Sequence, residues 1–202
     1  MNDVRVIILC KAPVPGRVKT RLMPDYSPEE AARLHAAMAR TVISRTSSLF
    51  TDVRVAADES GHPFFADLGL PVMAQGPGDL GERLISLGER AYAENGSPVL
   101  FLGTDCPHMP TERLMRAATL IQTHDVVLGP VEDGGYDLIA CRRWLPGVFE
   151  HIRWSTPHTL EDTLARIRAL GLSVMLLDSS FDVDGADDVA RAMACGWHDE
   201  PA

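Results

Sequence analysis

The chain has too few cysteines, in the wrong arrangement, for a disulfide framework or a zinc site. Its four cysteines stand at positions 10, 106, 141 and 195, and no two of them form a Cys-x-x-Cys pair. Zinc sites and small disulfide-rich domains both need closely patterned cysteines. We therefore expect reduced thiols, as is usual in a cytoplasmic protein.

Long apolar runs are also missing. The run from Val4 to Cys10 is among the longest, and it is far shorter than the roughly 20 residues needed to cross a bilayer. The first residues lack the basic stretch and apolar core of a secretory signal. These absences predict a cytoplasmic protein with no membrane span.

Positive charge is scarce. The chain has 19 Lys and Arg against 28 Asp and Glu, a formal net charge of −9. A general nucleic-acid-binding protein needs a broad basic face, so we do not expect nucleic acid as a partner. A local basic pocket for one nucleotide stays open. With 202 residues, 46% of them hydrophobic, the chain can form one domain with a sizeable core over residues 1–202.

Short β-branched runs alternate with helix-like segments along most of the chain. Strands are predicted at 4–10, 52–57, 71–74, 98–103, 125–128, 137–141 and 173–177, and helices at 28–50, 63–68, 80–94, 111–123, 156–170 and, after a turn, within 182–193. This alternation indicates an α/β fold, a three-layer α/β/α sandwich around a mostly parallel sheet. Residues 137–141 follow the preceding strand so closely that they should run antiparallel, which makes the sheet mixed.

Ligand sites in such sheets lie at the carboxyl ends of the strands. Four loops leave the predicted strands at that edge, namely 11–21, 75–82, 103–106 and 129–136. We expect these loops, which are remote in sequence, to converge on one crevice.

The first of these loops is basic. Four cations, Lys11, Arg17, Lys19 and Arg21, stand within eleven residues directly after the first strand. Arginine offers a planar fork of donors and lysine a point charge, and both suit phosphate oxygens. The loop is not a P-loop, because the GxxxxGK[ST] pattern is absent. The alternative is a solvated basic loop, but its position favours phosphate binding.

An aspartate ends the apolar strand at 98–103. Asp105 could cap a helix or sit in a turn, but a second acidic pair, Asp182 and Asp184, precedes the last helix. A hard divalent ion takes a few carboxylate oxygens together with substrate phosphates. We expect Asp105 and one of these two, Asp184 in the first place, to bind Mg²⁺ or Mn²⁺.

The stretch Asp133-Gly134-Gly135-Tyr136 is at least a tight turn, because glycines supply positive φ angles. It can also shape the acceptor end of the pocket. Trp154 could stack on a ring of the acceptor or simply fill core. Residues 76–81, GPGDLG, match GxGxxG and raise the alternative of an NAD(P)-binding oxidoreductase. That alternative ranks second, because the match is not at the first turn and leaves the basic loop unexplained.

Six motifs together resemble a known bacterial family. They are CKAPVPGRVKTRL, GDLGERL, GTDCP, GPVEDGGYDLI, RWST and DVDGADDV, in that order. The chain resembles a glycosyltransferase-like family of the nucleotide-diphospho-sugar transferase superfamily, which has the GT-A fold. More distantly, the basic loop and the DVD turn are similar to 2-phospho-lactate guanylyltransferases. The resemblance implies that an aspartate at the end of a central strand, here Asp105, coordinates Mg²⁺ or Mn²⁺. This chain departs from the family at Asp137, where a second aromatic is expected, and at Gly185-Ala186, where Thr-Pro is expected.

The leading hypothesis is a metal-dependent transferase acting on a nucleotide-activated substrate, with glycosyl transfer from a nucleotide-diphospho-sugar placed first. Nucleotidyl transfer from a triphosphate to a small phosphorylated acceptor is the alternative, and a non-catalytic nucleotide-binding module is the third possibility. The pattern does not specify the base, the sugar, the acceptor or the number of subunits.

The expected catalytic residues are Asp105, Lys19 and Arg21, and the expected nucleotide- and phosphate-binding residues are Lys11, Ala12, Pro13, Gly16, Arg17, Lys19, Arg21, Gln75, Gly81 and Thr104. The expected acceptor residues are Asp133, Gly134, Gly135, Tyr136 and Trp154, and the expected metal ligands are Asp105 and Asp184.

Overall fold

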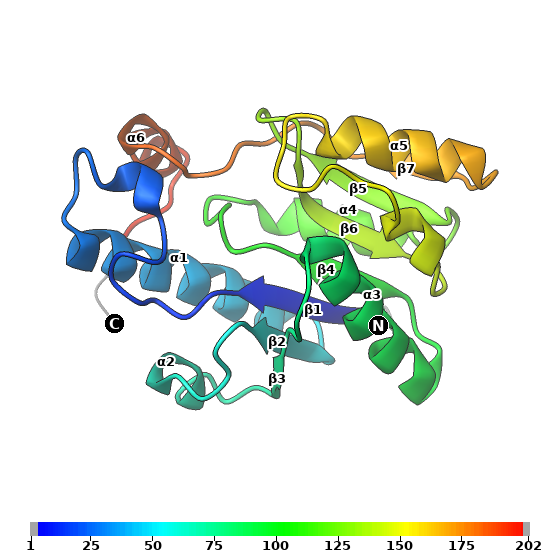
Figure 1. Ribbon diagram of the computed structural model, residues 1–202, viewed down its shortest axis with the longest axis horizontal. Coiled ribbons are helices and arrows are strands. Elements are labelled where there is room, and N and C mark those ends of the chain that lie inside the picture. Colours follow the sequence, from blue (N-terminus) through cyan, green and yellow to red (C-terminus); the bar gives the residue numbers. More distant parts are fainter. Residues whose placement is uncertain (1–3, 200–202) are drawn as a thin grey trace.

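A computed structural model describes residues 4–199, which form a seven-stranded sheet covered by helices on both faces (Figure 1). The strand order is β3-β2-β1-β4-β6-β5-β7. The strands are β1 (Arg5–Cys10), β2 (Val53–Ala57), β3 (Val72–Ala74), β4 (Val99–Leu102), β5 (Val126–Pro130), β6 (Tyr136–Cys141) and β7 (Val174–Leu176). Each predicted strand is present, so the predicted fold class is confirmed.

Strand β6 runs antiparallel to both of its neighbours, β4 and β5, whereas the other pairs are parallel. Only residues 131–135 separate β5 from β6. A parallel connection needs a crossover of about a dozen residues or more, so the chain must turn straight back. The predicted mixed sheet follows from this short connection.

Helices cover both faces of the sheet. They are α1 (Pro28–Leu49), α2 (Pro63–Ala66), α3 (Leu80–Asn95), α4 (Thr111–Leu120), α5 (Thr159–Ala169) and α6 (Ala186–Ala194), with 3₁₀ turns η1 (Thr20–Leu22) and η2 (Pro146–Phe149). Helices α1 and α4 pack on the face that carries Val6 and Ile8 of β1. Helices α3 and α5 pack on the opposite face, which carries Ile7. The period-two alternation of strand side chains thus supplies two cores.

Helix α1 begins with a capping box. The Ser27 hydroxyl accepts from the Glu30 amide at 3.2 Å, and the Glu30 carboxylate accepts from the Ser27 amide at 2.8 Å. Helix α5 begins at Thr159 instead of the predicted position 156. Ser155 adopts a left-handed conformation with φ of 58°, which cannot continue into a helix from that point.

The segment before and after α6 returns to the beginning of α1 (Figure 1). Phe181, Val183 and Trp197 form a third apolar cluster with Leu22 and Met38. The Trp197 indole also donates to the hydroxyl of Thr41 on α1 at 3.1 Å. This packing brings the DVD turn next to the basic loop. No helix within residues 4–199 is long and apolar enough to cross a membrane.

Candidate active site at the carboxyl ends of β1 and β4

A crevice of about 700 Å³ opens where β1 and β4 end. Three of the four predicted loops contribute to it, namely 11–21, 75–82 and 103–106, but the fourth, 129–136, does not. Residues 154 and 155 and Asp184 complete the lining. The lining residues are Leu9, Cys10, Lys11, Arg17, Val18, Lys19, Thr20, Arg21, His35, Gln75, Asp79, Leu80, Arg83, Gly103, Thr104, Asp105, Trp154, Ser155 and Asp184.

Lys19 joins the basic loop to the acidic residues of the crevice. Its ammonium lies 2.7 Å from Asp105 Oδ1 and 3.5 Å from Asp184 Oδ1. It also donates to the backbone carbonyl of Val183 at 2.7 Å. Only 6% of the Lys19 side chain is exposed, against 47% for Asp105 and 34% for Asp184. The expected metal ligands therefore share one protein cation.

The Lys19–Asp105 contact keeps both groups charged. Burial alone would lower the pKa of Lys19, but the charge and hydrogen bond of Asp105 outweigh it and raise that pKa. Burial likewise opposes ionisation of Asp105, and the Lys19 ammonium reverses this and lowers its pKa. A buried charge that meets its counter-ion at hydrogen-bonding distance is the arrangement that offsets desolvation.

The DVD turn is tied to the end of β4. The Val183 amide donates to the Asp105 carbonyl at 2.9 Å, which holds residues 182–184 beside the end of that strand. Asp184 lines the crevice. Asp182 instead accepts from the Cys106 thiol at 3.0 Å, and burial, followed by nearby acidic charges, raises its pKa to about 7. Asp184 lines the crevice although Gly185-Ala186, and not the expected Thr-Pro, follow it.

The two carboxylates fit a hard divalent ion whose coordination shell is completed by substrate. Both carboxylates lie within 3.5 Å of the same ammonium nitrogen, so their oxygens point toward a common place. Among residues 4–199, no group of three or more His, Cys, Asp or Glu could hold a metal by itself. Mg²⁺ is usually held by one or two carboxylates together with phosphates and water. Asp105 and Asp184 would hold such an ion.

The other cations of the crevice are more exposed. Arg21 pairs with Asp184 at 2.5 Å but keeps 73% of its side chain exposed, and Arg17 pairs with Glu59 outside the crevice and keeps 58%. Lys11 is exposed. The four predicted cations therefore do lie together, and three of them are accessible to an anion.

Two crevice residues have roles that the sequence did not suggest. Arg83 donates from Nε to the Gly78 carbonyl at 2.9 Å and from Nη1 to Gln75 Oε1 at 3.3 Å. Within the described part of the chain, no carboxylate pairs with it. His35 of α1 is buried, and its Nε2 lies 2.9 Å from the Lys11 carbonyl. Burial lowers the pKa of His35, so a neutral imidazole donates from Nε2 and fixes the start of the basic loop.

Several predicted phosphate-binding residues make contacts within the protein. The Ala12 amide donates to Asp58 at 2.7 Å, and Gln75 Nε2 donates to the backbone carbonyl of Ala56 at 2.9 Å. Pro13 lies on the other side of the loop, against α1 and α2, and Gly16 is at an exposed turn with φ of 78°. None of Ala12, Pro13 and Gly16 lines the crevice, whereas Gln75 and the buried Thr104 do.

Gly81 lies beneath Trp154. A Cβ at Gly81 would lie 2.4 Å from the indole nitrogen of Trp154 and 3.0 Å from the Phe149 carbonyl. Gly81 is buried and does not line the crevice, so the structure gives it a packing contact, and its contact with phosphate stays a prediction. The absent side chain lets the indole lie directly on the first turn of α3.

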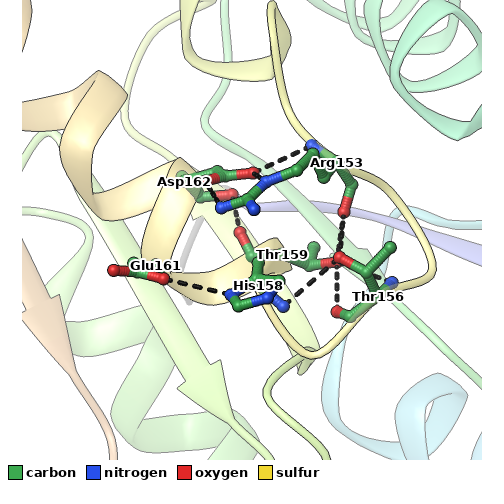
Figure 2. A network of polar contacts seen from close by, with 7 residues as sticks. Arg153, Thr156, His158, Thr159, Glu161 and Asp162 are labelled. Carbon is green, nitrogen blue, oxygen red and sulfur yellow. Dashed lines mark hydrogen bonds and ion pairs between the residues drawn. The ribbon is translucent and has the colours of Figure 1, made fainter.

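A network of polar contacts holds the segment that carries Trp154 (Figure 2). The Arg153 guanidinium forms two hydrogen bonds to Asp162, at 2.7 and 2.8 Å. The hydroxyls of Thr156 and Thr159 both donate to the Arg153 carbonyl, at 2.8 and 3.0 Å. Trp154 is thus fixed from both sides in sequence, as a wall of the crevice.

The DGGY turn supports this wall from behind. A Cβ at Gly134 would lie 2.1 Å from the Pro157 carbonyl, and the Tyr136 ring packs edge-on against Trp154 at 6.3 Å. Asp133 accepts from the Gly135 amide at 2.8 Å, which closes the turn. Of the five predicted acceptor residues, the structure places only Trp154 at the crevice. The other four do not line the crevice, and their contact with an acceptor stays a prediction.

Comparisons with known proteins identify the family and the fold of this chain. The model of a protein family described as "Uncharacterized protein conserved in bacteria (DUF2064)" matches residues 34–156. A crystal structure from Desulfovibrio desulfuricans G20, described as a "putative nucleotide-diphospho-sugar transferase", is 31% identical, with a TM-score of 0.86 over 92% of this chain and 84% of its own. The chain belongs to this DUF2064 family. No curated protein matches its sequence.

More distant structures share the fold. CMP:2-keto-3-deoxy-manno-octonic acid synthetase, solved with CTP, is 12% identical with a TM-score of 0.60, over 95% of this chain and 97% of its own. A protein from Mycobacterium tuberculosis H37Rv, solved with manganese, is 16% identical with a TM-score of 0.59, over 95% and 98%. The predicted resemblance to the nucleotide-diphospho-sugar transferase superfamily is therefore confirmed at the level of family and fold.

Proposed function

We propose that this DUF2064 protein is a metal-assisted nucleotidyltransferase, which joins a nucleoside triphosphate to a small anionic acceptor and releases pyrophosphate. The observation that carries the proposal is the single crevice in which Lys11, Lys19 and Arg21 surround the paired carboxylates Asp105 and Asp184. It lies where open α/β sheets bind ligands.

The balance of charge favours a triphosphate. Five cations line the crevice, namely Lys11, Arg17, Lys19, Arg21 and Arg83, against three carboxylates, Asp79, Asp105 and Asp184. A triphosphate and an anionic acceptor together carry more negative charge than a nucleotide-diphospho-sugar does. A pocket whose lining carries excess positive charge attracts and orients such anions. This is why we now place nucleotidyl transfer ahead of glycosyl transfer.

The protein's own residues would act by positioning and by charge. Lys11 and Arg21, which are exposed at the rim, would hold the outgoing phosphates. Lys19, beside Asp105, would offset charge that develops on them. A divalent ion held by Asp105 and Asp184 would supply Lewis-acid stabilisation of the same oxygens. Such transfer needs little covalent chemistry from the protein, and rate enhancement comes from orientation and preorganised charge.

Trp154 and Ser155 line the same crevice as the basic loop. An aromatic face that is fixed by a polar network loses little entropy when a ligand packs on it. We place the acceptor against this wall, so that its nucleophilic oxygen faces the phosphates.

Glycosyl transfer is the second candidate. It is supported by the description of the Desulfovibrio desulfuricans G20 structure, which is 31% identical to this chain. Both reactions would use the same phosphate-binding residues, and they differ in the group that leaves. Nucleotidyl transfer releases pyrophosphate, whereas glycosyl transfer releases a nucleoside diphosphate.

The leaving group provides the test. The purified protein is incubated with each nucleoside triphosphate, or with each nucleotide-diphospho-sugar, in the presence of Mg²⁺ or Mn²⁺ and a panel of small phosphorylated acceptors. Pyrophosphate release supports the proposal, and nucleoside diphosphate release supports the second candidate. Asp105→Asn should lower the rate by about a hundredfold or more, as loss of a preorganised charge usually does. Full activity of Asp105→Asn would contradict the mechanism, and tight binding without turnover would identify a binding module.

A further inference from the structure

The place shared by the two expected metal ligands is filled by the protein itself. The Lys19 ammonium lies 2.7 Å from Asp105 Oδ1 and 3.5 Å from Asp184 Oδ1, and a third contact at 2.7 Å ties it to the Val183 carbonyl. A divalent ion would need the same oxygens, at roughly 2.0–2.6 Å. An ammonium and a divalent cation cannot both occupy this space, because like charges at that distance repel strongly.

We propose that Lys19 closes this site to divalent cations until the phosphates of a substrate draw its ammonium away. This inference rests on the proposed function for the identity of the phosphates, but the exclusion itself depends only on the three contacts above. Lysine suits the task, because its charge stands on a flexible four-carbon stem and can change partners by side-chain rotation alone.

The displaced ammonium gains a new charged partner when an anion is bound. Two of the three carboxylates that line the crevice, Asp105 and Asp184, are the ones that the metal would take. Phosphate oxygens would replace them as the partner of Lys19. Substrate and metal would then strengthen each other's binding by the same factor, because such coupling is reciprocal.

The three contacts also explain why a divalent ion does not displace the Lys19 ammonium in the absence of substrate. With 6% of its side chain exposed, Lys19 has exchanged water for three oxygen partners. A metal that enters alone would take both carboxylates and leave this buried ammonium beside a divalent ion with only the Val183 carbonyl as a partner, which is costly. Removal of the lysine charge removes that cost, and this gives the experiment.

The test measures Mn²⁺ binding to the substrate-free protein, by the loss of the free Mn²⁺ signal in electron paramagnetic resonance. Lys19→Met keeps most of the length of the side chain and removes its charge. It should bind Mn²⁺ about 10- to 100-fold more tightly than the unmodified protein, within the usual range of coupling between sites. Lys19→Arg, which keeps the charge, should bind as weakly as the unmodified protein.

Two controls separate this exclusion from other effects. Arg33→Met removes a positive charge from an exposed position on α1, outside the crevice, and should leave Mn²⁺ affinity unchanged. The double variant Lys19→Met/Asp105→Asn should lose the gain, because a ligand is missing. Thermal unfolding with and without Mn²⁺ checks that each variant is folded and reports the same order of affinities.

The proposal is overturned if Lys19→Met binds Mn²⁺ no more tightly than the unmodified protein, or if Arg33→Met shows the same gain. Its outcome is independent of the turnover assay. A gain without pyrophosphate release would keep the exclusion and refute the proposed function. Pyrophosphate release without a gain would keep the function and refute the exclusion.

Discussion

The buried ion pair between Asp137 and Arg113 offers a prediction with a large expected effect. Only 2% of the Asp137 side chain and 8% of the Arg113 side chain are exposed. The pair is bidentate, with Nε–Oδ2 at 2.9 Å and Nη2–Oδ1 at 3.1 Å. Arg113 also donates to the Pro130 carbonyl at 3.3 Å, and a Cβ at Gly129 would lie 2.2 Å from Asp137 Oδ1. The carboxylate therefore sits in a space that is shaped for it.

Asp137→Leu alone should destabilise the protein by about 3–5 kcal/mol, because it leaves the arginine charge buried without its partner. This is a large part of the roughly 5–15 kcal/mol that holds a domain folded. Arg113→Met alone should cost a similar amount for the same reason. The double variant should recover most of that loss, because apolar residues of similar volume often replace a buried pair at little cost.

The assay is urea unfolding followed by tryptophan fluorescence, for the two single variants and the double variant. Arg116→Met is the matched control, since its ion pair with Asp178 is exposed on both sides and should contribute less than about 1 kcal/mol. A cost below about 1 kcal/mol for Asp137→Leu, or strictly additive costs in the double variant, would refute the reasoning.

Three further predictions follow from local geometry. Gly81→Ala should displace the Trp154 indole and destabilise the protein by about 1–2 kcal/mol in thermal unfolding, because overpacking outweighs the gain in helix propensity. The control Ser86→Ala, on the exposed face of α3, should leave stability unchanged in that experiment. Ser27→Ala removes the capping box of α1 and should cost about 1 kcal/mol, or about 2–4 °C in Tm, whereas an unchanged Tm would argue against the cap. The Arg153 guanidinium lowers the pKa of Asp162 to about 2, below its value of about 3.9 in the unfolded chain. The contribution of Asp162 to stability is therefore present above pH 4 and is lost as the pH falls toward 2. Asp162→Asn should therefore make Tm less dependent on pH in that window.

The sheet could be predicted from the sequence because its signals are local. Each strand is a short apolar run that ends at glycine, proline or a polar turn, and the short gap before β6 fixes its direction. The start of α5 could not be predicted this way. It depends on the left-handed Ser155 and on the contact of Arg153 with Asp162, neither of which leaves a periodic pattern.

The candidate site was predictable where the topology decides it. The basic loop and Asp105 follow adjacent parallel strands, so they had to meet. Whether a helical side chain reaches the crevice depends on how its helix is rotated, and for this reason Arg83 and His35 were missed. The DGGY turn was expected at the crevice because it lies at the same edge of the sheet, but Trp154 takes that position.

The packing of residues 181–197 on the start of α1 sets the order in which this site can be built on the ribosome. Asp184 is made about 165 residues after Lys19, which corresponds to roughly 8–33 s of synthesis. Until then, Leu22 and Met38 lack the apolar partners that Val183 and Trp197 provide. A nascent chain therefore exposes this patch, and leaves Lys19 with only one of its two carboxylates, until nearly the whole domain has emerged.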